Sequence, residues 1–252
     1  YVSQVGSQLR ERLGQAAQLL GVELPVYVIF TKVDRVPSFA DFAAVLDREE
    51  AGDALGATLP FDLDQETTAF RMADEFECRS VAAIGPYAGT ITEAGQAFGA
   101  LCDRAAAHGV LVALEFLPFT TIAPAADALR IVEQADRENG GVCVDLWHHQ
   151  RGAGDLALIE AIPGDRLVGI QVSDGPLVPA IDDYLDDCLR SRVPPGEGEM
   201  DVAGFVAAIR ATGTTAPWAL EVCNETAWET DGAAFVTACA DGLRRLLGGG
   251  HG

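Results

Sequence analysis

Four short apolar runs, each ending in a side chain that can bind a metal, constrain the fold of this chain more than any other feature. A continuous apolar run of four to eight residues is typical of a strand that is buried on both faces of a sheet. Helical patterns separate the runs, so we expect parallel strands in βα units. The runs are Val112–Glu115, Val142–Asp145, Val168–Gln171 and Trp218–Glu221.

The terminal side chains of these runs predict a metal site. Glu115, Asp145, Gln171 and Glu221 are about 25 to 50 residues apart in the chain, but the strand ends of a barrel converge on one face. Three carboxylates and an amide oxygen form an oxygen-rich site for a hard divalent cation. A single acidic side chain at a strand end often caps a loop or pairs with a basic residue. The prediction therefore depends on the four positions taken together.

The formal net charge of −21 excludes several classes of partner. The chain has 252 residues, enough for one large domain or two small ones, and Lys32 is its only lysine. So acidic a surface repels nucleic acid and anionic membranes, and a substrate phosphate would need a local arginine. No apolar run approaches the roughly 20 residues of a membrane span, and residues 1–3 lack the basic start of a signal peptide. We expect a cytoplasmic protein.

The cysteines indicate a reducing compartment. They lie at positions 78, 102, 143, 188, 223 and 239, and no Cys-x-x-Cys pair occurs. Cys143 and Cys223 fall inside or just after predicted strands, where a free thiol behaves as a small apolar residue. We expect all of them to be reduced and structural.

Strands and helices alternate from residue 67 onward. Strands are expected at 80–84, 110–116, 142–146, 167–172 and 217–222. Helices are expected at 67–76, 92–108, 124–139, 155–162, 201–211 and 231–247. A polar loop is expected at 173–200. Before residue 67, we expect a buried strand at 25–31 and a loop or junction at 51–66.

Five motifs follow one another in this second part of the chain. They read GVLVALEFLPF, GVCVDLWHH, LVGIQVSDGP, RVPPGEGEMD and APWALEVCNE. In this order, residues 67–247 resemble the sugar isomerase/epimerase superfamily that has the xylose-isomerase-like TIM barrel. The resemblance implies an α/β fold in which this part supplies strands four to eight of the barrel.

The resemblance assigns roles to the terminal side chains. It makes Glu115, Asp145, Gln171 and Glu221 the metal ligands, with Glu115 and Glu221 also as the acid–base pair. The third ligand is usually histidine in the family, whereas this chain has Gln171. An amide oxygen still binds a hard cation, but it binds a transition metal more weakly than imidazole does. The expected cofactor is therefore a divalent metal, Mn²⁺, Co²⁺ or Mg²⁺.

Two further residues match positions that contact substrate in the family, His148 and Arg192. His149 is an alternative to His148 as the functional histidine. Arg192 could instead pair with surface carboxylates in so acidic a chain. Gly196 and Gly198 are expected to serve loop geometry rather than phosphate binding.

The chemistry of these residue types fits ketose isomerisation independently. The reaction removes a proton next to a carbonyl group and returns one elsewhere. A divalent metal polarises the substrate oxygens and stabilises an enediolate. Two glutamates on opposite sides of the substrate can then move the proton. The expected partner is a small sugar or polyol.

The N-terminal segment, residues 1–60, has a different character. The stretch from Leu20 to Pro60 resembles part of the cytoplasmic GTPase-like domain of the type VI secretion IcmF/TssM family, and Thr31–Asp34 resembles a guanine-specificity motif. No G-x-x-x-x-G-K-[ST] motif occurs in the chain, so we expect no nucleotide binding. The predicted organisation is an IcmF/TssM-like α/β fragment at 1–60 and a truncated TIM-like barrel at 61–252. An open parallel edge would favour a homo-oligomer.

Three functional interpretations follow. The first is a divalent-metal-dependent sugar or sugar phosphate isomerase or epimerase. The second is a non-catalytic fragment of a type VI secretion membrane-complex protein, fused to an inactive barrel remnant. The third is another reaction on the same barrel, either dehydration of a cyclic polyol or phosphodiester cleavage. The acidic surface and the small number of histidines disfavour the third.

Overall fold

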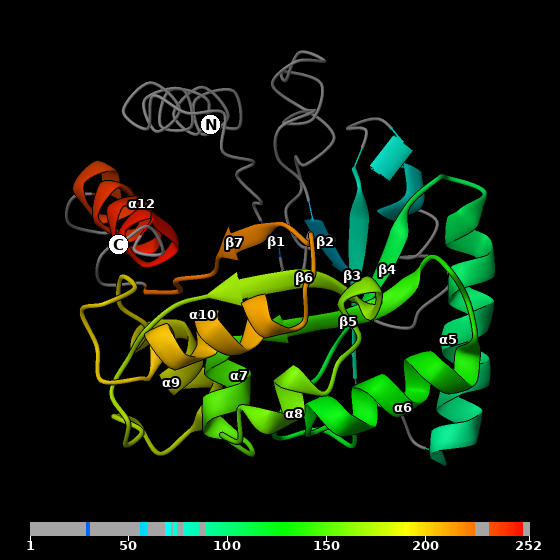
Figure 1. Ribbon diagram of the computed structural model, residues 1–252, viewed down its shortest axis with the longest axis horizontal. Coiled ribbons are helices and arrows are strands. Elements are labelled where there is room, and N and C mark those ends of the chain that lie inside the picture. Colours follow the sequence, from blue (N-terminus) through cyan, green and yellow to red (C-terminus); the bar gives the residue numbers. More distant parts are fainter. Residues whose placement is uncertain are drawn as a thin grey trace, which may run out of the picture.

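A parallel sheet whose strands follow their order in the chain forms the centre of the molecule (Figure 1). The computed structural model describes residues 29–30, 56–59, 69–71, 73–74, 78–85, 89–224 and 232–248. The strands are β1 (Ile29–Phe30), β2 (Gly56–Leu59), β3 (Ser80–Ile84), β4 (Leu111–Glu115), β5 (Gly140–Asp145), β6 (Leu167–Val172) and β7 (Trp218–Leu220). Every neighbouring pair is parallel.

Helices connect the strands and cover the outer face of the curved sheet (Figure 1). They are α5 (Ile91–Ala106), α6 (Ala125–Ala135), α7 (Leu146–Arg151), α8 (Ala157–Glu160), α9 (Tyr184–Arg190), α10 (Val202–Ala211) and α12 (Gly232–Gly248). A capping box fixes the start of α5, where Thr90 and Glu93 satisfy each other's backbone N–H groups. Repeated βα units of this kind make the structure a partial α/β TIM barrel.

The core lies between the sheet and these helices. Every residue of β5 is buried, as expected for a strand covered on both faces. Phe98 of α5, Ile131 of α6 and Phe205 of α10 are almost completely buried against the sheet. Because neighbouring strands pair in parallel, their carboxyl ends lie at one edge of the sheet.

The structure confirms the five strands predicted from residue 67 onward. It also contains elements that the sequence did not predict. Helix α9 lies inside the expected polar loop 173–200, where Asp183 caps it by accepting hydrogen bonds from the N–H groups of Leu185 and Asp186. Its apolar side chains are divided between a buried Cys188 and exposed leucines, so no apolar stripe marks it. Strand β2 lies inside the expected loop 51–66.

The N-terminal segment 1–60 is described only at β1 and β2. Both strands continue the parallel order of the sheet, since β1 pairs with β2 and β2 pairs with β3. Most of the predicted strand 25–31, and residues 31–34 with the Thr-Lys-Val-Asp motif, lie outside the described residues. The division of the chain at residue 60 stays a prediction.

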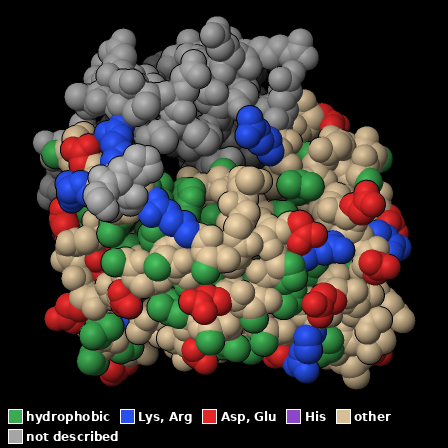
Figure 2. Space-filling model, in the orientation of Figure 1, with side chains coloured by type: hydrophobic (Ala, Val, Ile, Leu, Met, Phe, Trp, Pro, Cys, Tyr) green, Lys and Arg blue, Asp and Glu red, His purple; other side chains and the backbone are tan. Residues whose placement is uncertain are grey.

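Charged side chains lie on the surface (Figure 2), and the cysteines form no disulfides. Figure 2 shows acidic and basic side chains spread over the described part of one face, some of them side by side, with apolar side chains between them. All cysteines are free. Among the helices that the structure describes, none combines the length and the apolar character that crossing a membrane requires.

Candidate functional site

Three of the predicted ligands meet at the carboxyl edge of the sheet. Glu115 and Asp145 are the last residues of β4 and β5, and Glu221 directly follows β7. The backbone N–H of Glu221 still donates to Val172 O at 3.1 Å, which holds this residue against the end of β6. One oxygen from each of these carboxylates and one ring nitrogen of His148, all atoms that can bind a metal, lie within 4.8 Å of one another. We call these four residues the ligand cluster.

Gln171, the fourth predicted ligand, lies beside the ligand cluster in the sheet. It is paired in register with Asp145 on β5 and is buried. Its Oε1 accepts a hydrogen bond from the Cys143 thiol at 3.3 Å. Cys143 precedes Asp145 by two residues, so both point to the same side of β5. The structure therefore places Gln171 next to the site, and its role as a metal ligand stays a prediction.

Helix α7 explains how His148 enters the cluster. Asp145 caps this helix, because its Oδ1 accepts a hydrogen bond from the backbone N–H of His148 at 2.9 Å. The His148 ring then lies between two partners, with Nε2 3.3 Å from Glu115 Oε1 and Nδ1 2.6 Å from the Tyr184 hydroxyl. Tyr184 comes from α9, where the sequence predicted only a polar loop.

His149, the alternative histidine, lies elsewhere. Its ring packs edge-on against Phe116 with the ring centres 6.4 Å apart, and neither ring nitrogen has a hydrogen-bond partner among the described residues. Burial lowers its pKa, against a smaller raising effect of Asp155. The geometry thus brings His148, and not His149, to the carboxylates.

Arg192 links two of the carboxylates. Its Nη1 donates to Asp145 Oδ2 at 2.9 Å, to Glu221 Oε2 at 3.2 Å and to the Glu221 carbonyl oxygen at 2.8 Å. Only 1% of its side chain is exposed. This ion pair is buried inside the site, so the alternative of a surface ion pair is wrong. The expectation that Arg192 contacts substrate stays a prediction.

The two carboxylates that share Arg192 differ in their pKa. Burial alone would raise the pKa of Asp145, but Arg192, followed by His148, lowers it to about 2. For Glu221, burial has the largest effect and raises the pKa well above its usual value, despite Arg192 and with help from Asp145 and Glu115. Arg192 therefore favours the ionised form of Asp145, whereas burial favours the protonated form of Glu221.

Asp174 is a residue whose role the sequence did not reveal. Its carboxylate accepts hydrogen bonds from four backbone N–H groups, those of Gly175, Gly196, Gly198 and Met200. Its own backbone pairs with Val193, next to Arg192. The Gly-x-Gly loop is thus folded around Asp174, which supports the structural role expected for both glycines and fixes the chain on the C-terminal side of Arg192.

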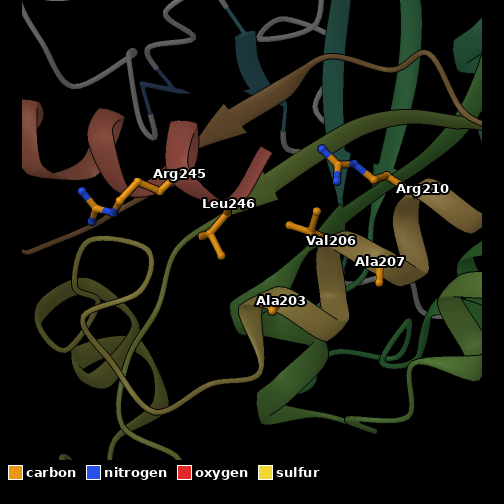
Figure 3. Close-up of a pocket in the computed structure, with 6 residues that line it drawn as sticks. All are labelled: Ala203, Val206, Ala207, Arg210, Arg245 and Leu246. Carbon is orange, nitrogen blue, oxygen red and sulfur yellow. The ribbon is translucent and has the colours of Figure 1, made fainter. Parts of the chain in front are cut away.

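A hollow of about 500 Å³ lies between α10 and α12. Figure 3 shows apolar side chains between two arginines, and the lining consists of Ala203, Val206, Ala207, Arg210, Arg245 and Leu246. It contains no carboxylate, imidazole or thiol, so it offers no usual ligand for a divalent cation. The candidate functional site is the ligand cluster.

Several known proteins resemble stretches of the chain. A 3-dehydroshikimate dehydratase of Pseudomonas putida is 40% identical over 117 residues, which cover 46% of this chain and 18% of that protein. An inosose isomerase of Bacillus subtilis is 28% identical over 115 residues, 45% of this chain and 40% of that protein. The type VI secretion component TssM1 of Pseudomonas aeruginosa is 43% identical over 54 residues, 21% of this chain and 5% of that protein. The chain thus spans less than half the length of each of these relatives.

Structural similarity covers nearly the whole chain. The crystal structure of the IOLI protein with a binding zinc atom superposes with a TM-score of 0.78 at 15% identity, over 96% of this chain and 93% of that one. The model of the family described as a xylose isomerase-like TIM barrel matches residues 9–239. The chain therefore belongs to the xylose isomerase-like TIM barrel family.

Proposed function

We propose that the chain contributes the active site of a divalent-metal-dependent enzyme that removes a proton next to a carbonyl group of a polyhydroxylated compound. The observation that carries this proposal is the convergence of the ligand cluster within 4.8 Å. Three carboxylates are hard oxygen donors, and they fit Mn²⁺, Co²⁺ or Mg²⁺. Glu115, Asp145 and Glu221 would hold the ion, with Gln171 as the predicted fourth ligand. When bound, the ion supplies a Lewis acid for the substrate oxygens.

The protein residues would move the protons. Glu115 ends β4 and lies beside His148 Nε2, whereas Glu221 follows β7, three strands away in the sheet. We assign Glu115 as the base that takes the proton next to the carbonyl, and Glu221 as the acid. His148 and Arg192 bind substrate oxygens in this proposal.

Dehydration is the reaction that we place first. The 40% identity to a 3-dehydroshikimate dehydratase supports it, and so reverses the order that the sequence favoured. Glu115 would take a proton from the carbon next to the carbonyl, and the electron pair of that bond would expel the hydroxyl group from the following carbon. That hydroxyl group would take the Glu221 proton and leave as water. With 3-dehydroshikimate, loss of water leads to aromatic 3,4-dihydroxybenzoate.

Isomerisation or epimerisation is the second candidate. It shares the first proton transfer, but the proton returns to the substrate and no water leaves. The similarity to an inosose isomerase supports it. A non-catalytic fragment of a secretion complex is the remaining alternative, supported by the 54 residues aligned with TssM1.

Turnover of two substrates separates these candidates. The chain is freed of metal with a chelator, then supplied with Mn²⁺, Co²⁺ or Mg²⁺ and tested with 3-dehydroshikimate and with an inosose. Metal-dependent appearance of 3,4-dihydroxybenzoate, followed by its absorbance, supports dehydration. Conversion of the inosose to an isomer, with deuterium gained from D₂O next to the carbonyl, supports isomerisation instead. A folded chain that binds no metal and turns over neither substrate supports the non-catalytic fragment.

A further inference from the structure

Arg192 enters the ligand cluster through a single nitrogen. Nη1 makes all the contacts to Asp145 and Glu221. The remainder of the guanidinium is anchored on α9, where Nε donates to the Cys188 carbonyl oxygen at 3.2 Å and Nη2 donates to Cys188 Sγ at 3.0 Å. A small rotation about this anchor would therefore withdraw Nη1 from the carboxylates without releasing the side chain.

The oxygen that Arg192 uses on Asp145 is the one that a metal would also need. Asp145 Oδ1 already accepts the hydrogen bond that caps α7. Oδ2, the other oxygen, accepts the hydrogen bond from Arg192. The Arg192 contact to Glu221 Oε2 repeats this situation on a second predicted ligand. Two cations that share the same two carboxylates repel each other, so each should weaken the binding of the other.

We infer that Arg192 is the internal counter-cation of this site and competes with the divalent ion for Asp145 and Glu221. Without an ion, Arg192 neutralises a fully buried carboxylate that would otherwise be strongly destabilising. With an ion, Nη1 withdraws around its Cys188 anchor and becomes available to a substrate oxygen. The inference rests on the proposed metal site. The opposite role, in which Arg192 merely orients the ligands and so strengthens metal binding, predicts the reverse sign.

The chain offers a matched control, Arg151. It also forms a buried ion pair, with Nε 3.0 Å from Asp187 Oδ2 and side-chain exposures of 5% and 2%. Both guanidinium groups lie near the ring of Trp147, at 4.2 Å for Arg151 and 5.3 Å for Arg192. Arg151 makes its described hydrogen bonds to Asp187 and to the carbonyl oxygens of Pro176 and Leu177, outside the ligand cluster.

The experiment compares Arg192→Met, Arg151→Met and the unmodified chain in a chelator and in Mn²⁺. Thermal unfolding and calorimetric titration are the readouts, so no turnover is needed. We expect Arg192→Met to lower the Tm in the chelator, to gain more Tm from Mn²⁺ than the unmodified chain does, and to bind Mn²⁺ about tenfold more tightly. Arg151→Met should lower the Tm in both conditions and leave the Mn²⁺ affinity unchanged.

Three results would overturn the inference. Equal or weaker Mn²⁺ binding by Arg192→Met, with normal binding by the unmodified chain, removes the competition and leaves the metal site intact. A similar gain in affinity in Arg151→Met makes the effect a general consequence of losing a cation. No Mn²⁺ binding by the folded unmodified chain removes the metal site itself. If Arg192→Met does not fold in the chelator, Arg192→Gln is used, since it also removes the charge but its amide can still donate to the buried carboxylates, and affinity no higher than that of the unmodified chain overturns the inference.

Discussion

At the scale of single residues, two side chains that share one arginine, Asp145 and Glu221, differ in burial and in pKa. Asp145 is fully buried, ionised and bonded to both Arg192 and the start of α7. Glu221 is 18% exposed on its side chain and has a raised pKa. Arg192 thus favours the charged form of Asp145 and burial favours the protonated form of Glu221, so the two side chains suit different roles.

We predict that Asp145→Asn mainly lowers the free energy of unfolding and that Glu221→Gln mainly lowers kcat. Asp145→Asn leaves Arg192 without its fully buried charged partner and should cost about 3–5 kcal/mol of unfolding free energy. In the metal-free chain burial favours the protonated form of Glu221, which glutamine resembles, so Glu221→Gln should change the stability of that chain little. Glutamine cannot donate the proton, so kcat should fall about 10²–10⁴-fold. Denaturant unfolding and turnover of 3-dehydroshikimate measure the two effects. Full activity of Glu221→Gln would end its assignment as the acid.

Gln171 is the residue at which this chain departs from the histidine usual in its family. We predict that Gln171→His tightens binding of Co²⁺ or Mn²⁺, because imidazole suits these metals better than an amide oxygen does. Calorimetric titration of the variant and the unmodified chain measures the change. Gln171→Leu is the control, since it also loses the Cys143 hydrogen bond but offers no ligand atom. Unchanged or weaker binding by Gln171→His would count against Gln171 as a ligand.

At the scale of elements, α9 holds the partners of both residues expected to contact substrate. The Tyr184 hydroxyl forms a hydrogen bond with the His148 ring. Four residues later, the carbonyl oxygen and the Sγ of Cys188 accept hydrogen bonds from Arg192. We predict that Tyr184→Phe, which keeps the ring packed against Phe119, lowers kcat about 10–100-fold, because His148 loses the partner that orients its ring toward substrate. The Tm should stay nearly constant. Phe119→Leu is the matched packing control, and an equal loss of function there would assign the effect to packing alone.

The loop that follows Arg192 depends on a close approach of backbone to carboxylate. A Cβ added at Gly198 would lie 2.3 Å from Asp174 Oδ1 and 2.4 Å from the backbone nitrogen of Gly175. We predict that Gly198→Ala displaces this loop, lowers the Tm and raises KM through Arg192. Gly248→Ala is the control, since nothing lies within 4 Å of its Cβ. Equal Tm values for the two variants would show that the loop yields without consequence.

The elements differ in how far the sequence predicted them. The runs that end at Glu115 and Asp145 are marked by continuous apolar residues, because both faces of β4 and β5 are covered. Both the strands and the approach of their terminal side chains could therefore be predicted. Helix α9 has only a cap at Asp183 and leaves Leu185 exposed, so hydrophobic periodicity did not reveal it. The hydrogen bond between Tyr184 and His148 joins side chains 36 positions apart in the chain. It depends on tertiary packing, so local sequence patterns could not predict it.

At the scale of the whole molecule, the N-terminal segment 1–60 combines two signals. It contains the stretch that resembles the IcmF/TssM family, yet β1 and β2 pair in order with the rest of the sheet, and the family model begins at residue 9. The segment contributes β1 and β2 to the sheet, but this does not imply that it contributes catalytic residues. The ligand cluster comes only from residues 115–221.

We therefore predict that the N-terminal segment 1–60 supports the fold without supplying chemistry. Asp34→Ala should leave turnover unchanged, and GTP should not raise the Tm, since the chain has no P-loop. Deleting residues 1–60 should have a different effect, because it removes β2, the neighbour of β3 in the sheet. In that pair, Thr58 lies opposite Ala82 and Leu59 lies opposite Ala83. The exposed parallel edge should lower the Tm and cause self-association, detected by light scattering, while any chain that stays folded keeps its metal affinity. A GTP-dependent rise in Tm, or loss of activity in Asp34→Ala, would instead place a functional site in the N-terminal segment.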